Sequence, residues 1–141
     1  MTEPTYNVVV TAPITQSRIR SVTDEMNLYW AMAVWWGEDA PIGGKQHNDP
    51  ERLYVLYAED GERWSTPTMA KAAGVKTYLK SVTWKQLGDA IGAIARHDVT
   101  NDEYQMRAAM DLLTHPDDAD WDADTGDYMV QWAAFGQLMF G

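Results

Sequence analysis

The stretch that decides the fold is RLYVLYA at Arg52–Ala58, which is followed by an Asp-Gly dipeptide at positions 60 and 61. Aromatic and branched aliphatic residues at this density are typical of a β-strand, and Asp-Gly favours a tight turn. Residues 63–64 then begin a returning strand, so the sequence predicts a β-hairpin. A further strand is expected at residues 6–11 (YNVVVT), which end just before an Ala-Pro pair.

Helical periodicity lies between these two strand-forming stretches. Residues 15–36 carry apolar side chains at steps of three and four, which predicts one amphipathic helix that ends at Gly37. The alternative for its second half is a strand over residues 29–36, where apolar side chains also alternate with period two. The length of the pattern favours the helix.

Two capping-box patterns predict a pair of helices after residue 82. Thr83 with Gln86, and Thr100 with Glu103, have the spacing at which two side chains satisfy each other's free backbone amides at a helix start. One apolar face is expected on the second of these helices. It comprises Tyr104, Met106, Ala108, Met110, Leu112 and Leu113.

A short helix and a long final helix complete the pattern. The short helix spans residues 67–73, between a Thr-Pro start and a Gly stop, and the segment 75–82 after it is ambiguous. An acidic linker at residues 115–124 precedes the final helix, which runs from about residue 125 to residue 140. We therefore predict a single α+β domain over residues 1–141, with a small antiparallel or mixed sheet of about three strands and about four to five helices packed against it.

Composition limits what such a domain can do. The chain carries a formal net charge of −10, which argues against direct nucleic-acid binding because phosphates are recognised by Lys and Arg. Disulfides and thiol chemistry are excluded because there is no cysteine. The three histidines lack metal-ligand spacing and no nucleophile turn is present, so no metal or cofactor is expected and an enzyme is disfavoured. Without a signal-peptide pattern or an apolar run of about 20 residues, we expect a cytoplasmic protein that does not enter a membrane.

Aspartates near the end of the chain are candidate partner-binding residues. No Lys or Arg occurs from Ala108 to Gly141, whereas seven Asp do. An EF-hand is excluded because no register supplies its Gly and its Glu, and the run also suits a solvated linker that caps the last helix. Two tryptophans are added because neighbours on a helix point about 100° apart, so that one of them is a candidate for exposure at a partner site. The alternative, which we favour slightly, is that a sheet covers one side of the helix and a second helix covers the other. The predicted partner-binding residues are Asp117, Asp118, Asp120, Trp121, Asp122, Asp124, Asp127, Trp35 and Trp36.

Three functions are compatible with these features. The leading hypothesis is a non-enzymatic acidic binding protein that inhibits or occludes a basic partner protein, as immunity proteins, DNA mimics and phage anti-defence proteins do. One alternative is a small-molecule-binding or nucleotide-binding protein or enzyme whose loop closes over a pocket. The other is a self-assembling structural component that buries exposed aromatic side chains against a second copy. The loop residues of the first alternative are Gly43, Gly44, Lys45, His47 and Asp49.

Overall fold

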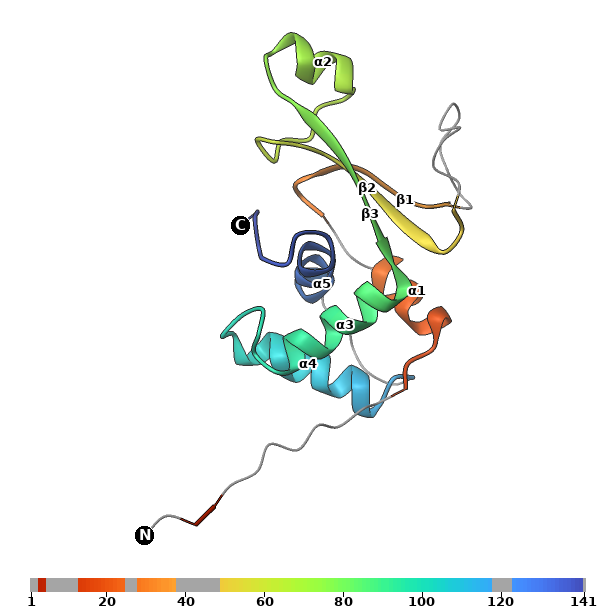
Figure 1. Cartoon of the computed structure of the whole chain (residues 1–141), viewed down its shortest axis with the longest axis vertical. Coiled ribbons are helices and arrows are strands. Elements are labelled where there is room, and N and C mark those ends of the chain that lie inside the picture. The colour runs from red at the N-terminus through yellow and green to blue at the C-terminus, as the bar shows by residue number, and fades with distance from the viewer. Residues whose placement is uncertain (1–2, 5–12, 25–27, 38–48, 118–122, 141) are drawn as a thin grey trace.

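The computed structural model describes residues 3–4, 13–24, 28–37, 49–117 and 123–140 (Figure 1). Within these residues, three strands form an antiparallel sheet and five helices accompany it, which confirms the predicted α+β class. The strand expected at residues 6–11 lies outside the described residues. The order of elements is α1 (Gln16–Asp24), β1 (Ala31–Trp36), β2 (Arg52–Ala58), α2 (Pro67–Ala72), β3 (Thr77–Thr83), α3 (Trp84–Ala95), α4 (Glu103–Thr114) and α5 (Ala123–Phe135).

The sheet has the order β1-β2-β3, so the apolar strand β2 lies at its centre. Leu53, Val55 and Tyr57 alternate along β2, join the main apolar core and are at most 7% exposed. Figure 1 shows α1, α3 and α5 on one side of the sheet, while α2 lies at one end of it. The core therefore lies between one face of the sheet and these helices, and it extends to α4, which packs on α3 and α5.

Helix α3 is the centre of the helical layer. Leu87, Ile91 and Ile94 recur at steps of four and three and are fully buried, which contributes roughly 1.5–3 kcal/mol for each side chain. Both α4 and α5 pack against α3. The predicted capping box at its start is confirmed, because Gln86 N donates to Thr83 Oγ1 at 3.2 Å and Thr83 N donates to Gln86 Oε1 at 2.8 Å.

The helix predicted over residues 15–36 is wrong in its second half. Helix α1 ends at Asp24, and residues 31–36 form strand β1. The indole of Trp36 packs in the core and donates to Asp24 Oδ1 at 3.0 Å, whereas that of Trp35 stacks on Tyr54, which is outside the main core cluster. Successive side chains that point to opposite faces are typical of a strand. The alternation of apolar residues at positions 29–36 therefore indicated the correct element, whereas the length of the pattern did not.

The hairpin predicted after β2 is also wrong in its second strand. The strand that pairs with β2 is β3, and α2 intervenes between them. Residues 63–64 are not in a strand: Arg63 Nε donates to the Ala31 carbonyl at 3.1 Å, and Trp64 Nε1 donates to Asp60 Oδ2 at 3.1 Å. The short helix itself is confirmed, because Thr66 caps it and Gly74 follows it with φ of +79°.

The last two helices begin and end at positions that differ from the prediction. Helix α4 is capped by Asp102, whose Oδ1 accepts from Tyr104 N at 2.9 Å, and not by the expected pair of Thr100 and Glu103. Asp is a strong N-cap because its carboxylate accepts from free amides of the first turn. Helix α5 ends at Phe135, before residue 140, because Gly136 takes the left-handed conformation with φ of +68°.

Candidate functional site

Asp127 is buried, although the sequence suggested that it belongs to an exposed acidic surface. Only 7% of the residue is exposed, and its Oδ1 accepts from Trp30 Nε1 at 2.6 Å and from Gln131 Nε2 at 3.1 Å. Helical spacing explains this placement, because Gln131 follows Asp127 by one turn on the buried face of α5. The carboxylate of Asp127 therefore joins α5 to the segment before β1 and is not on the surface.

Gln131 extends this buried cluster to the end of the described chain. Its side chain is fully buried, and its Oε1 accepts from the backbone N–H groups of Met139 and Phe140, both at 2.8 Å. The Phe140 ring then stacks on Trp30 at a centroid distance of 5.0 Å. Residues 136–140 are thus held against α5 and the indole of Trp30 by polar contacts and by an aromatic contact.

Burial raises the pKa of the Asp127 carboxyl above its ordinary value of 3.8. The hydrogen bonds from Trp30 and Gln131 act in the opposite direction, since they stabilise the carboxylate, and the negative charge of Asp124 raises the pKa further. Desolvation is the largest of these effects. The ionised form of this side chain is therefore less favourable in the folded protein than in water.

The structure divides the other predicted acidic residues into two groups. Asp117 and Asp124 are exposed, at the end of α4 and the start of α5. Asp118, Asp120, Trp121 and Asp122 lie outside the described residues. Across the whole chain, ten of the 21 acidic residues but only one of the 11 basic residues follow residue 97. The excess of negative charge therefore belongs mainly to the part of the chain that contains α4 and α5.

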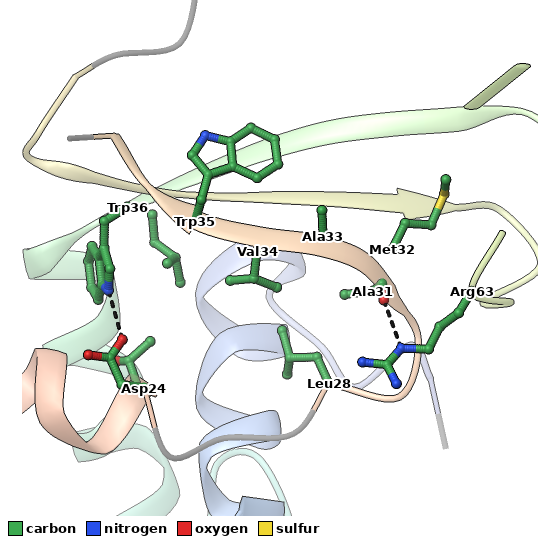
Figure 2. A pocket seen from close by; sticks show the side chains of 11 residues that line it. Asp24, Leu28, Ala31, Met32, Ala33, Val34, Trp35, Trp36 and Arg63 are labelled. Atoms are coloured by element: carbon green, nitrogen blue, oxygen red, sulfur yellow. Dashed lines mark hydrogen bonds between the residues drawn. The ribbon is translucent and has the colours of Figure 1, made fainter. Parts of the chain in front are cut away.

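The two predicted tryptophans have different environments, and neither is freely exposed. Trp36 is 5% exposed and stacks on Trp84 at a centroid distance of 4.5 Å, with Arg20 placed 5.3 Å from its ring centroid. Trp35 is half-buried against Tyr54. Trp36 is therefore a core residue, whereas Trp35 presents part of its ring on the side of the sheet away from the helices (Figure 2).

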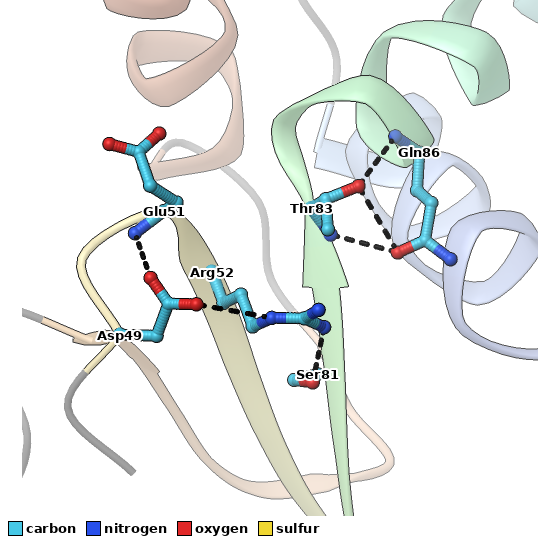
Figure 3. A network of polar contacts seen from close by, with 6 residues as sticks. All are labelled: Asp49, Glu51, Arg52, Ser81, Thr83 and Gln86. Carbon is cyan, nitrogen blue, oxygen red and sulfur yellow. Dashed lines mark hydrogen bonds and ion pairs between the residues drawn. The ribbon is translucent and has the colours of Figure 1, made fainter.

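Four of the predicted loop residues, Gly43, Gly44, Lys45 and His47, lie outside the described part of the chain. Asp49 is exposed and pairs with Arg52, whose Nε lies 3.3 Å from Asp49 Oδ2. Arg52 also donates from Nη1 to Ser81 Oγ at 3.1 Å (Figure 3). Asp49 is therefore bound into a polar network that joins the start of β2 to the end of β3.

The outward face of α4 combines carboxylates with exposed apolar side chains. Its buried face consists of Gln105, Ala109 and Leu112, and the opposite face is turned away from the core. Tyr104 is 62% exposed and Met110 is 46% exposed, so these two residues are not in the apolar core as the sequence suggested. The α4 acidic face, as we call it, comprises Asp102, Glu103, Tyr104, Met110 and Asp111, all of which are exposed.

Charges on the α4 acidic face are only partly balanced. Arg107 Nη2 lies 3.5 Å from Glu103 Oε2, and His115 Nδ1 lies 3.3 Å from Asp111 Oδ1. Asp111 is in the last turn of α4, which contains no basic residue. A carboxylate near the negative end of the helix dipole costs roughly 0.3–1 kcal/mol, so helix stability does not account for Asp111.

Sequence reasoning missed this face because Tyr104 and Met110 look like core residues by type. The signal that separates them is the spacing of Ala109 and Leu112, which lie three residues apart and place Met110 on the other side of the helix. Asp111 was counted in the negative charge, but it was not assigned to a site. The capping Asp102 adds a further carboxylate at the start of the same helix.

A groove of about 270 Å³ runs beside β1 (Figure 2). Most of the residues that line it are of apolar type, and Asp24 and Arg63 are the charged residues among them. Asp24 holds the indole of Trp36 near one end of β1, and Arg63 holds the carbonyl of Ala31 at the other end. The groove therefore has a carboxylate at one end, which also lies 3.8 Å from Arg20 Nε, and a guanidinium at the other.

Searches for known features add little to this description. In the parts of the chain that the structure describes, no cluster of His, Asp and Glu side chains is arranged to hold a metal ion. Among the described helices, none has both the length and the apolar character needed to cross a bilayer. Comparisons of the chain with protein-family models, with curated proteins and with solved structures find no match.

Proposed function

We propose that this chain is a non-enzymatic binding protein that uses the α4 acidic face, together with the exposed Asp117 and Asp124, to occlude a basic surface of another protein. Immunity proteins, DNA mimics and phage anti-defence proteins work by this principle. The observation that supports the proposal most directly is that α4 places carboxylates and two exposed apolar side chains on the same side. Asp102 also caps the helix, but the packing of its buried face (Gln105, Ala109 and Leu112) does not require Asp111 or Met110 on the other side.

The carboxylates and the exposed apolar side chains of α4 have different physical roles in binding. A concentration of negative charge accelerates the encounter with a basic partner and orients it, and this effect is weakened by salt. Apolar and aromatic side chains that lose water on contact supply most of the affinity. Tyr104 suits this second role, because its ring is large and rigid and ends in a hydroxyl group.

The chemistry of the surface also indicates the kind of partner. A face that carries carboxylates around a tyrosine and a methionine complements a patch of Lys and Arg with an apolar centre. Patches of this kind occur on proteins that hold nucleic acid, where the basic side chains contact phosphates. The partner class that we propose is therefore a nucleic-acid-binding protein whose binding surface the chain covers.

A charge-reversal pull-down tests this proposal. The purified chain is immobilised, partners are identified by mass spectrometry and the interaction is repeated with the purified partner at increasing salt. The double variant E103K/D111K is expected to weaken binding by more than about tenfold, because like charges then oppose a basic patch. The matched control E51K/E62K makes the same change in net charge at exposed positions outside α4 and is expected to retain binding.

Equal loss of binding in both double variants would show that only net charge matters and would contradict the proposal. The apolar contribution is tested separately with Tyr104→Ala, which is expected to reduce affinity at high salt as well as at low salt. Its control is Tyr78→Ala, because Tyr78 is also exposed (43%) but lies on β3. The absence of a salt-sensitive protein partner would contradict the proposal, and stabilisation by a nucleotide or a divalent ion would favour the small-molecule alternative.

A further inference from the structure

We infer that two copies of this chain associate through the outer edge of β1, so that their sheets join across a two-fold axis into one six-stranded sheet. This inference concerns the edge of the sheet and does not depend on the α4 acidic face. It is carried by three features of the described residues: the bare edge of β1, the contrast with the edge formed by β3, and the charges at the two ends of the groove.

From Ala33 to Trp36, the outer edge of β1 lacks the features that usually prevent strand pairing, whereas the backbone of Ala31 already bonds to Arg63 and Leu28. Within the described residues, β1 pairs with β2 on one side and with no strand on the other. Its sequence, AMAVWW, contains no charged residue and no proline. A register irregularity is confined to residues 31–33, and residues 33–36 pair regularly. Free backbone groups along such an edge form a template for another strand.

The opposite edge of the sheet is built differently. Burial alternates from residue to residue along most of β3 (TYLKSVT), and Lys80 at the centre of the strand is exposed. A lysine on an edge strand opposes pairing with another chain, because an approaching strand would have to cover its charge. One edge of this sheet therefore carries a blocking charge, and the other does not.

The groove along β1 favours a second copy of the same chain as the occupant. An antiparallel two-fold contact places the Trp36 end of one β1 beside the Ala31 end of the other. Asp24 is at the first of these ends and Arg63 is at the second (Figure 2), so each Asp24 would face an Arg63 of the other copy in addition to Arg20 of its own chain, whose Nε lies 3.8 Å from Asp24 Oδ2. Among the described residues, Arg63 is exposed and has no carboxylate partner. Two reciprocal ion pairs would thus close the interface at both ends.

The first test compares the two sheet edges. Ala33 on β1 and Leu79 on β3 are both paired with Leu56, so they lie at the same level on opposite sides of β2. We expect the wild-type chain to be a dimer in light scattering, Ala33→Lys to be a monomer, and Leu79→Lys to remain a dimer. A wild-type monomer at the highest concentration reached, or a dimer that survives Ala33→Lys, would overturn the inference.

The second test reverses the charges. Arg63→Glu is expected to weaken the dimer at least about tenfold, because two carboxylates then meet at each end of the interface. The double variant D24K/R63E restores opposite charges and is expected to recover most of the lost affinity. Thermal unfolding shows whether the double variant is folded, since Asp24 also holds Trp36. A folded double variant that fails to recover affinity would exclude the two-fold arrangement. If the double variant does not fold, the comparison of Ala33→Lys with Leu79→Lys tests the inference instead.

Discussion

Asp124 and Asp127 are three residues apart on α5, yet the structure gives them opposite surroundings. Asp124 is exposed in the first turn, where a carboxylate is favoured by the positive end of the helix dipole. Asp127 is buried and hydrogen-bonded to Trp30 and Gln131. The two residues represent two populations among the described acidic side chains, one that is buried and holds the fold together and one that is exposed at the surface.

Replacing Asp127 should have the largest effect on stability. Asp127→Ala leaves Trp30 Nε1 and Gln131 Nε2 without their acceptor, and a buried donor that loses its partner costs about 1–3 kcal/mol. We expect the free energy of unfolding in urea to fall by about 3 kcal/mol. The matched variant Asp124→Ala should change it by less than about 0.5 kcal/mol. Similar losses for both variants would remove the distinction between the two populations.

A smaller loss is expected from Gln131→Leu. Leucine fills nearly the same volume, but it cannot accept from the Met139 and Phe140 amides or donate to Asp127. The amides at the end of the chain can turn to water, so we expect a loss of about 2 kcal/mol. The control is Gln137→Leu, because Gln137 is exposed. A Gln131→Leu variant as stable as this control would show that the buried cluster contributes little.

The raised pKa of Asp127 predicts how stability depends on pH. A carboxyl whose pKa is higher in the folded state binds its proton more tightly there, so its contribution to stability is complete below the unfolded value near 3.8. This contribution is lost as the pH rises through the higher folded pKa. Asp127→Asn keeps an acceptor oxygen but does not titrate. We therefore expect the stability of the wild type minus that of Asp127→Asn to fall with rising pH, and a rise would contradict the assignment.

The smallest effect on stability is expected for Asp111→Ala on the α4 acidic face. Removing a carboxylate from the last turn of a helix relieves an unfavourable interaction with the dipole, so the unfolding free energy should rise by a few tenths of a kcal/mol. Partner binding should become weaker in the same variant. A loss of stability would place Asp111 with the residues that hold the fold together and would argue against its role in binding.

The sequence predicted the fold class because the relevant signals are local. RLYVLYA, the Thr83 capping box and the Gly74 stop act within a few residues, and the structure shows β2, α3 and α2 there. The helix predicted through Trp36 was wrong because the apolar residues of positions 29–36 fit both the helical period of 3.6 and the strand period of 2. Residues 31–36 form a strand because they pair with β2. A partner strand distant in sequence cannot be read from a local pattern.

The site could be predicted less well than the fold, because burial and exposure also depend on residues that are distant in sequence. Counting aspartates locates the negative charge, but burial of Asp127 depends on Trp30, which is 97 residues away in the chain. Exposure of Tyr104 and Met110 depends on which face of α4 meets α3 and α5, and residue type alone suggested the wrong face. Charge is a property of composition, whereas accessibility is a property of the packed molecule.

The surroundings of Trp30 also bear on how the chain folds during its synthesis. Its indole contacts Tyr57, Phe135 and Phe140, and its N–H reaches Asp127. Three of these four neighbours, Asp127, Phe135 and Phe140, are synthesised after all three strands of the sheet. Contacts between residues so far apart in sequence form slowly. We therefore expect the aromatic face of the nascent sheet, with Trp30 and Tyr57, to stay uncovered until α5 has been synthesised. Folding of the sheet against its helices is therefore expected to be completed only after α5 and residues 136–140 have been synthesised.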